Sequence, residues 1–330
     1  MVKERDYWFD NAKFVLIAAV ILGHCIDRLG VGPICLNANT TMSFFRMPMF
    51  IFISGYFSKK MEWPRFWGVI SGILETYLIM SLLHIGYSLF NGVPFSIAQL
   101  IEPRWTLWYL LCIVFWRAII QVCDRVKPIY LVSTSILIGV FSGFVPLYSI
   151  FSLQRVFSMA PFFMLGFFCR QEKLSIRGIK KLHPLLAIAF LILVYIFVSR
   201  LDFPMLSFLR GKYPYIYFKD YSLWLLPLVR LAVYVGSIVT SICVMRLIPE
   251  KKSWMSNEGI NTLLYYLYHP FIIVGMQFGE RFINLPSSLI AMLFYTVLIV
   301  FIIWLLIKIK FFRDLPRLFT KVFSWIVSRA

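Results

Sequence analysis

Ten apolar runs follow one another along this chain, and each is long enough to match or approach the thickness of a membrane. A helix needs about 20 apolar residues to cross the hydrocarbon core. The runs cover roughly residues 14–30, 42–58, 66–90, 106–122, 129–147, 152–169, 184–199, 222–245, 261–279 and 287–307. The pattern predicts an all-α, polytopic integral membrane bundle of about ten transmembrane helices, formed by residues 1–307.

The charge of the chain supports this class and gives an orientation. Hydrophobic residues make up 60% of the sequence and charged residues 15%, with a net charge of +18. The cations lie in short segments between the runs and are not gathered into a stripe, so we expect no nucleic-acid partner. With the N-terminus in the cytoplasm, 22 of the 33 cations face inward and seven face outward. The positive-inside rule then predicts a multi-pass protein of the cell membrane with both termini cytoplasmic.

Two further features complete the outline of the chain. Residues 308–330 alternate basic and large apolar side chains, a pattern typical of an amphipathic helix on the inner leaflet. The six cysteines show no short CxxC-type spacing, and we expect no metal.

Ionisable side chains at membrane depth are costly, and their presence indicates function. They are His24, Arg46, Glu75, His84, Arg117, Arg155, Arg230 and His269. Because successive spans run in opposite directions, His24, Arg46 and Arg155 are predicted at one depth, in the outer half of the membrane, with Arg230 in the outer half of its own span. Ten residues separate Lys13 from His24, and His24 lies about 16 Å farther along the helix axis.

A histidine surrounded by arginines has a defined chemistry. Positive charge favours the neutral imidazole, which is the form that accepts a proton from a hydroxyl group. The arginines can hold an anion or stabilise a developing oxyanion. The alternative is that these polar groups only hydrogen-bond neighbouring helices. His269 precedes Pro270, which interrupts the helical hydrogen-bond ladder, so a structural role is open for it too.

Five stretches resemble one known family. The first runs from Asp10 through Lys13 to His24, and the others are residues 45–57, 107–110, 161–168 and 264–270. Together they resemble the membrane acyltransferase 3 family, in particular its fucose 4-O-acetylase-like branch, in a form without an added SGNH hydrolase-like domain. Two departures stand out. Arg46 occupies a position where many members have histidine, and Arg65 is followed three residues later by Gly68 where many members have a second arginine.

The resemblance implies an O-acyltransferase. Such an enzyme most often moves acetyl from cytoplasmic acetyl-CoA, the acyl donor, to a sugar hydroxyl of a cell-surface polysaccharide or its lipid-linked precursor. By this resemblance, His24 is the general base or forms an acetyl-histidine intermediate. The remaining site residues follow the motifs and the charge pattern: Lys13, Arg46 and Arg155 for catalysis; Lys13, Lys59, Lys60 and Arg65 for the donor phosphates; and Asp10, Arg46, Trp108, Arg230 and His269 for the acceptor.

Two other functions compete with acyl transfer. A polysaccharide or lipid-linked sugar export protein would also use intramembrane arginines and aromatic residues, although no inverted repeat supports it. A non-catalytic scaffold in a glycan-assembly complex is the third hypothesis. The export hypothesis leaves the spacing between Lys13 and His24 unexplained.

Overall fold

A computed structural model describes residues 5–90, 92, 94–96, 101–103, 105–123, 125–147, 151–280 and 282–317. Within these ranges the chain forms helices and connecting turns, with no strand. The longer helices are α1 Tyr7–Leu29, α2 Gly32–Ser43, α3 Arg46–Tyr56, α4 Trp63–Phe90, α6 Trp108–Val122, α7 Pro128–Phe141, α8 Leu153–Gln171, α9 Pro184–Arg200, α11 Leu226–Leu247, α13 Thr262–Gly279 and α14 Leu289–Leu306. The all-α prediction is confirmed.

Short helices link these elements. They are η1 Ser142–Phe144, η2 Ile176–Lys181, α10 Met205–Leu209, η3 Tyr215–Phe218, α12 Trp254–Glu258, η4 Gly259–Asn261, α15 Lys310–Asp314 and η5 Leu315–Arg317. Two helices begin at a proline, which lacks the N–H that the first turn would leave unpaired: α7 begins at Pro128 and α9 at Pro184.

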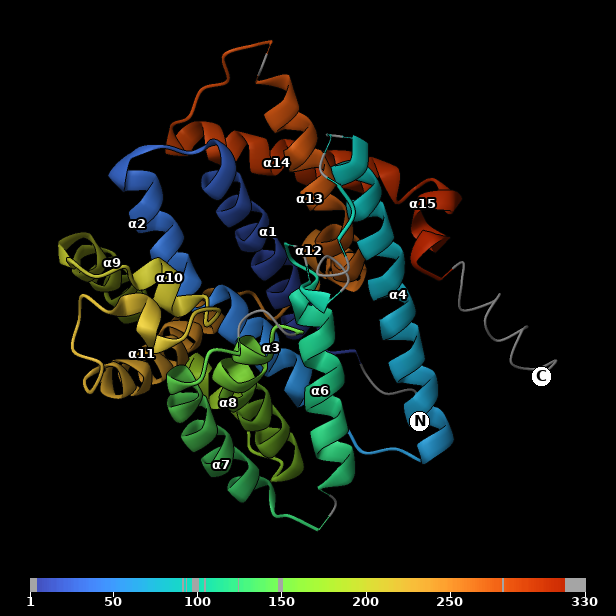
Figure 1. Ribbon diagram of the computed structural model, residues 1–330. Coiled ribbons are helices and arrows are strands. Elements are labelled where there is room, and N and C mark those ends of the chain that lie inside the picture. The colour runs from blue at the N-terminus through green and yellow to red at the C-terminus, as the bar shows by residue number, and fades with distance from the viewer. Residues whose placement is uncertain are drawn as a thin grey trace.

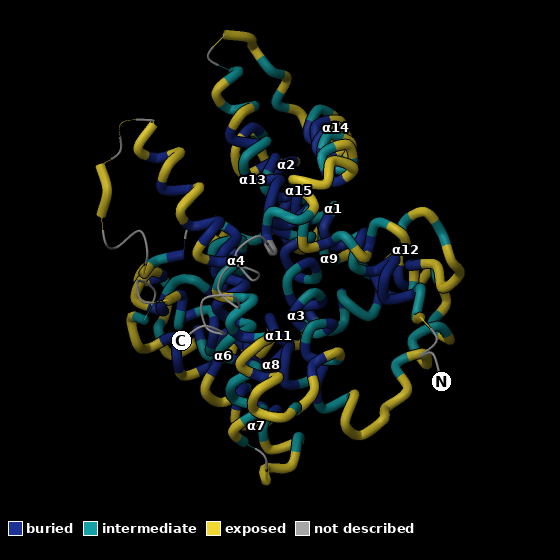
Figure 2. The backbone as a smooth tube through the Cα atoms, turned by 90° about the vertical axis from the view of Figure 1, so that its right-hand side faces the viewer, coloured by how far each residue is buried: buried dark blue, intermediate teal, exposed yellow. Residues whose placement is uncertain are grey.

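Helices α1 and α3 lie in the middle of the bundle (Figure 1). Helix α1 packs on α13, α14 and α12, while α3 packs on α8, which in turn packs on α7. The buried backbone is concentrated in this centre, and α7 at the periphery is largely exposed or half-buried (Figure 2). The central helices therefore position side chains that neither water nor lipid surrounds.

The peripheral helices expose apolar side chains, as expected of surfaces that face lipid. The exposed apolar residues include Leu185, Leu193, Ile196, Phe294 and Val297. In water such wide apolar faces would be unfavourable. Four helices, α1, α4, α11 and α14, are long and apolar enough to cross a membrane, and α6, α7 with η1, and α9 are shorter apolar helices. Each of the ten predicted spans overlaps a helix, but a ten-span topology with cytoplasmic termini remains a prediction.

The second predicted span, residues 42–58, differs from the structure. It is divided into α2 and α3, with a break at Phe44 and Phe45. Pro48 explains the position of the break, because it has no N–H for the carbonyl of Phe44, four residues earlier, and its ring would clash with that carbonyl. Helix α3 has 11 residues, about 16 Å, so α3 alone is too short for the span that was predicted.

Close contact between α3 and α8 depends on two glycines. A Cβ on Gly55 would collide with the backbone carbonyl of Phe163, and a Cβ on Gly166 would collide with that of Phe52. Small residues of this kind allow helix backbones to approach closely in membrane proteins.

The described part of the C-terminal tail folds back onto the bundle. The hydroxyl of Tyr268 donates a hydrogen bond to the carbonyl of Phe312, and the hydroxyl of Thr76 donates to that of Pro316. Residues 318–330 of the predicted amphipathic segment lie outside the described residues.

Candidate functional site

A cavity of about 420 Å³ opens at the C-terminal end of α1. We call it the His24 cavity. Side chains from several helices and loops converge on it, among them His24 and Arg28 of α1, Arg46 of α3, Trp108 of α6, Arg155 of α8, Arg210 after α10 and Tyr266 of α13. The lining is rich in cations and aromatic rings, and Asp27 contributes a carboxylate. This composition suits an acceptor with hydroxyl groups or an anionic ligand.

The imidazole of His24 lies between the cavity and the protein interior. Its side chain is 31% exposed, and one carboxylate oxygen of Asp27 lies 3.8 Å from its Nδ1 atom. On the other side its ring stacks on the ring of His269, with centroids 5.4 Å apart and planes 26° apart. His24 is therefore accessible to a ligand and is also held in place by neighbouring groups.

A hydrogen bond fixes the orientation of the His269 ring. Its Nδ1 atom lies 2.9 Å from the backbone carbonyl oxygen of Tyr265. A carbonyl only accepts hydrogen bonds, so Nδ1 carries a proton. In the described part of the chain the buried Nε2 atom has no hydrogen-bond partner. His269 thus forms a fixed wall behind His24.

Arg46 packs against α1 at Gly23, where the absence of a side chain leaves room for its guanidinium group. A Cβ at Gly23 would overlap the guanidinium group of Arg46. Arg46 is 7% exposed, and its guanidinium donates a hydrogen bond of 2.6 Å to the side-chain oxygen of Asn39. The amide group of Asn39 in turn donates to Asp27 at 2.7 Å. Arg46 is thus fixed by a buried polar chain that leads to the carboxylate beside His24.

The carboxylate of Asp27 also forms an ion pair with Arg210. A guanidinium nitrogen of Arg210 lies 2.6 Å from an oxygen of Asp27, so the loop after α10 is tied to the end of α1. Arg155 lies beneath this loop, with its guanidinium 4.7 Å from the ring centroid of Trp108 and its Nε atom donating to the carbonyl of Arg210 at 3.3 Å. Cation–π and backbone contacts therefore hold Arg155 at the cavity wall.

The structure brings together four of the predicted site residues. His24, Arg46, Trp108 and Arg155 all line the His24 cavity, and His269 stacks behind His24. Arg230 does not line it. Its side chain is 2% exposed, lies 4.0 Å above the ring of Phe208 and donates to the carbonyl of that residue.

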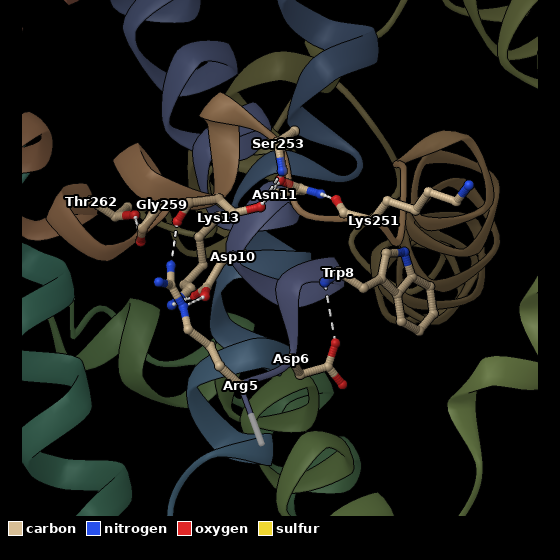
Figure 3. A network of polar contacts seen from close by, with 11 residues as sticks. Arg5, Asp6, Trp8, Asp10, Asn11, Lys13, Lys251, Ser253, Gly259 and Thr262 are labelled. Atoms are coloured by element: carbon tan, nitrogen blue, oxygen red, sulfur yellow. Dashed lines mark hydrogen bonds and ion pairs between the residues drawn. The ribbon is translucent and has the colours of Figure 1, made fainter. Parts of the chain in front are cut away.

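The remaining predicted residues lie toward the other end of α1 or beyond the end of α3. Lys13 and Arg5 both form ion pairs with Asp10, at 2.7 Å and 2.6 Å (Figure 3). Lys59, Lys60 and Arg65 are exposed on the segment that leads from α3 into α4, and they are not among the residues that line the His24 cavity.

Asn11 anchors this N-terminal end of α1. It is fully buried and donates to the carbonyls of Pro249 and Lys251 at 2.8 Å and 3.0 Å (Figure 3). Its side-chain oxygen accepts hydrogen bonds from Ser253 and Ser256. This network joins α1 to the segment around α12.

Sequence reasoning missed Asp27, Arg210 and Tyr266, which line the cavity, and Asn39, which bonds both Asp27 and Arg46. Asp27 left a detectable signal, because it follows His24 by three residues and therefore lies on the same helix face. Arg210 could not be predicted from the sequence, because it belongs to a loop whose path depends on tertiary packing.

Comparison with known proteins decides the class of the molecule. Residues 6–308 match the model of the acyltransferase 3 family, described as an acyltransferase domain. The chain belongs to the acyltransferase 3 family. The resemblance inferred from the sequence motifs is therefore confirmed at the level of the family, and the protein is a membrane acyltransferase. Comparison with curated proteins and comparison with solved structures give no match.

The family match includes the whole of the His24 cavity. His24, Arg46, Arg155 and Arg210 all lie within the matched residues. The acyltransferase 3 match ends at residue 308, just before α15.

Proposed function

We propose that this acyltransferase moves an acetyl group from cytoplasmic acetyl-CoA to a sugar hydroxyl of a cell-surface polysaccharide or its lipid-linked precursor, with His24 as the general base. The observation that carries the proposal is the placement of His24. It is a histidine open to a polar, cation-rich cavity, backed by a second histidine ring and flanked by a carboxylate.

The reaction assigns a task to each group around the cavity. Neutral His24 takes the proton of the acceptor hydroxyl while its oxygen attacks the carbonyl carbon of the thioester. The negative charge that develops on the carbonyl oxygen is stabilised by a nearby guanidinium, and Arg46 and Arg155 are the candidates. The tetrahedral intermediate then collapses, the carbon–sulfur bond breaks, and the imidazolium returns its proton to the leaving thiolate.

Asp27 supports the charged form of His24 in this scheme. Its carboxylate lies 3.8 Å from His24 Nδ1, close enough for electrostatic stabilisation of the imidazolium. Because Arg210 and Asn39 hold Asp27 on its other side, the carboxylate is fixed before the reaction begins.

The acceptor side is supported by the aromatic residues of the cavity. Trp105, Trp108, Tyr213 and Tyr266 line it together with the arginines. Apolar ring faces beside a few fixed polar groups are the usual composition of a site that binds and orients a small ligand such as a sugar unit.

A two-step route through an acetyl-histidine uses the same residue. In that route His24 attacks the thioester first, and the acceptor hydroxyl then takes the acetyl group. Incubation of the purified protein with acetyl-CoA alone separates the two routes, because only the two-step route adds an acetyl group to His24 that intact mass spectrometry detects.

The topology proposed with this function has ten spans and both termini in the cytoplasm. It places the N-terminal end of α1 inside and the His24 cavity toward the outer half of the cell membrane. Support comes from the distribution of cations along the sequence and from the helix that overlaps each predicted span.

The test compares cells that express the wild type with cells that express His24→Ala at equal levels. Proton NMR of the surface polysaccharide is expected to show acetyl esters with the wild type and none with the variant. Equal ester signals would refute the catalytic assignment. If the variant instead abolishes surface display of the polysaccharide itself, export is the better description.

A further inference from the structure

A second cavity, of about 400 Å³, opens at the N-terminal end of α1. We call it the basic cavity. Three cations line it: Arg170 at the end of α8, Lys173 in the turn that follows, and Arg177 in η2. Asp6, the N-cap residue of α1, is the acidic residue of the lining and forms an ion pair with Arg177 at 3.4 Å. In the described part of the chain Arg170 and Lys173 form no ion pair, so the cavity keeps a net positive charge.

The turn that carries these cations is closed by the end of α8. Backbone N–H groups of Glu172 and Leu174 donate to the carbonyls of Phe168 and Cys169, and Lys173 takes a φ of 52°. The left-handed conformation at Lys173 is one that glycine adopts more easily.

Aromatic rings form the opposite wall of the basic cavity. Phe9 stacks on Tyr56 with centroids 5.0 Å apart, and Trp8 lies beside Phe9. The indole N–H of Trp8 donates to the carbonyl of Met245 at 3.1 Å, and the ammonium group of Lys180 lies 5.1 Å from the Trp8 ring. Trp8 and Phe9 are 1% and 3% exposed, so the wall is rigid, and Tyr56 is its half-buried ring.

Lys180 has a structural part in this wall. Its ammonium group donates to the carbonyls of Arg246 and Ile248, and desolvation lowers the pKa of Lys180. The ammonium group of Lys180 is thus hydrogen-bonded within the protein. Arg170, Lys173 and Arg177 are the cations of the cavity that can bind a ligand.

A third cavity, apolar and about 180 Å³ in volume, lies between α3, α8 and α11. It shares Ile176 with the basic cavity. Along α3 it is lined by Pro48, Met49, Phe52 and Ile53, which share one helix face. Pro48 is two residues from Arg46, which lines the His24 cavity. The apolar cavity therefore lies along α3 between the basic cavity and the His24 cavity.

We propose that the basic cavity holds the phosphate groups of a coenzyme A thioester, and that the acyl-bearing arm follows the apolar cavity toward Arg46. The inference rests on the proposed acetyl-CoA-dependent function and adds the site of the donor. Guanidinium and ammonium groups bind phosphate.

The separation of the two polar cavities favours a donor with a long arm. Trp8 and His24 are 16 residues apart on α1, about 24 Å along the helix axis. A compact donor such as acetyl phosphate cannot occupy the basic cavity and reach His24 at the same time, whereas a thioester on a linear arm can. Lys59, Lys60 and Arg65, which the sequence pattern favoured for the donor, are not among the residues that line the basic cavity.

The experiment uses the full-length protein in lipid nanodiscs and measures coenzyme A binding by calorimetry beside transfer kinetics. Lys173→Gly removes one cation at a position where the backbone favours glycine, so it is expected to keep the melting temperature. Arg170→Gln, Lys173→Gly and Arg177→Gln combined are expected to weaken coenzyme A binding at least tenfold and to raise the KM for acetyl-CoA with kcat changed less than twofold. The matched control is Arg125→Gln with Lys127→Gln, two exposed cations, which is expected to change neither value.

A variant that fills the apolar cavity provides a second, independent test of the path of the acyl-bearing arm. Ile242→Trp is expected to abolish acetyl transfer while adenosine 3′,5′-bisphosphate, which has no arm, still binds as in the wild type. Leu228→Trp on an exposed face of the same helix is the control and is expected to stay active.

The outcomes separate this inference from the proposed function. If the wild type binds no coenzyme A, the proposed donor is wrong and both fail. If the wild type binds coenzyme A and the triple variant binds it equally well, the basic cavity is not the site while acetyl-CoA-dependent transfer stands. A tenfold loss with Lys59→Gln and Lys60→Gln, without a loss in the triple variant, would place the donor on the exposed segment instead.

Discussion

The ring of His24 stacks on the ring of His269 with centroids 5.4 Å apart. One of these histidines faces the cavity, and the other is completely buried and tied to the carbonyl of Tyr265. The buried ring restricts the rotamers of the exposed one, so the direction in which His24 accepts a proton is set before a substrate binds. Positioning of this kind matters because small displacements of a general base are costly in rate.

The role of His269 can be tested by separating its shape from its polarity. His269→Phe keeps an aromatic ring behind His24 and is expected to retain at least a third of the wild-type kcat. His269→Ala leaves a gap that frees His24 and is expected to lower kcat at least tenfold, with the KM for the donor unchanged. Equal losses in both variants would show that the Nε2 or Nδ1 atom of His269, and not its stacking, is what matters.

Gly23 gives a test of Arg46 that leaves the arginine in place. Gly23→Ala puts a methyl group where the guanidinium lies, so the Arg46 side chain must move out of the cavity wall. We expect acetyl transfer to fall at least tenfold, as with Arg46→Gln. The matched control is Gly68→Ala in α4, where a Cβ meets nothing within 4 Å, and which should leave transfer unchanged. Full activity of Gly23→Ala would argue against a catalytic role for Arg46.

The Asp27–Arg210 pair should behave as one unit in a double-mutant cycle. Asp27→Asn and Arg210→Gln each break the same 2.6 Å ion pair, so the double variant is expected to be no less active than Asp27→Asn alone. Groups in direct contact usually show a coupling energy of about 0.5–3 kcal/mol. Asp27→Asn combined with Arg200→Gln, an exposed arginine at the end of α9, should give additive effects. Additivity in the first cycle would contradict the contact.

The contact between α3 and α8 makes a prediction about stability. Gly55→Ala and Gly166→Ala each introduce a methyl group against a backbone carbonyl that cannot move aside cheaply, and overpacking of this kind costs about 1–3 kcal/mol. We expect a lower melting temperature for each variant in detergent, measured by differential scanning fluorimetry. Gly275→Ala in α13, where a Cβ meets nothing within 4 Å, should melt at or above the wild-type temperature.

The common level of Arg46, Arg155 and His24 could be predicted from the sequence, but the direction of each arginine around its helix could not. Helix direction alone placed Arg46 and Arg155 level with His24, and both line the same cavity. The same argument placed Arg230 in the outer half of its span, yet its side chain points toward Phe208. Depth follows from counting residues, whereas rotation about the axis depends on which neighbour packs against which face.

The break between α2 and α3 shows a similar limit. Pro48 lies within the second predicted span, and the helix is interrupted one turn earlier, at Phe44 and Phe45, because a proline removes the hydrogen-bond partner of the carbonyl four residues before it. The consequence for the site is large, since the break makes Arg46 the first residue of α3 and lets Asn39 of α2 reach both Arg46 and Asp27.

The cations of the basic cavity show what the sequence pattern alone does not reveal. Lys59, Lys60 and Arg65 form the cluster of charge that the sequence pattern favours for the donor, whereas Arg170, Lys173 and Arg177 lie in a separate basic segment. Only the fold places the latter three around one cavity with Trp8, Phe9 and Tyr56, residues that are far apart in the chain.

The most direct measurement of the central claim is the transfer of radiolabelled acetyl from acetyl-CoA to the glycan fraction of membranes that contain the protein. Replacement of His24 by glutamine keeps a polar side chain but removes the base, and general-base catalysis contributes about 10²–10⁴-fold. We therefore expect His24→Gln to incorporate label at least 100-fold more slowly than the wild type, with coenzyme A binding unchanged. Incorporation within twofold of the wild type would show that His24 is not the base and would contradict the proposed mechanism.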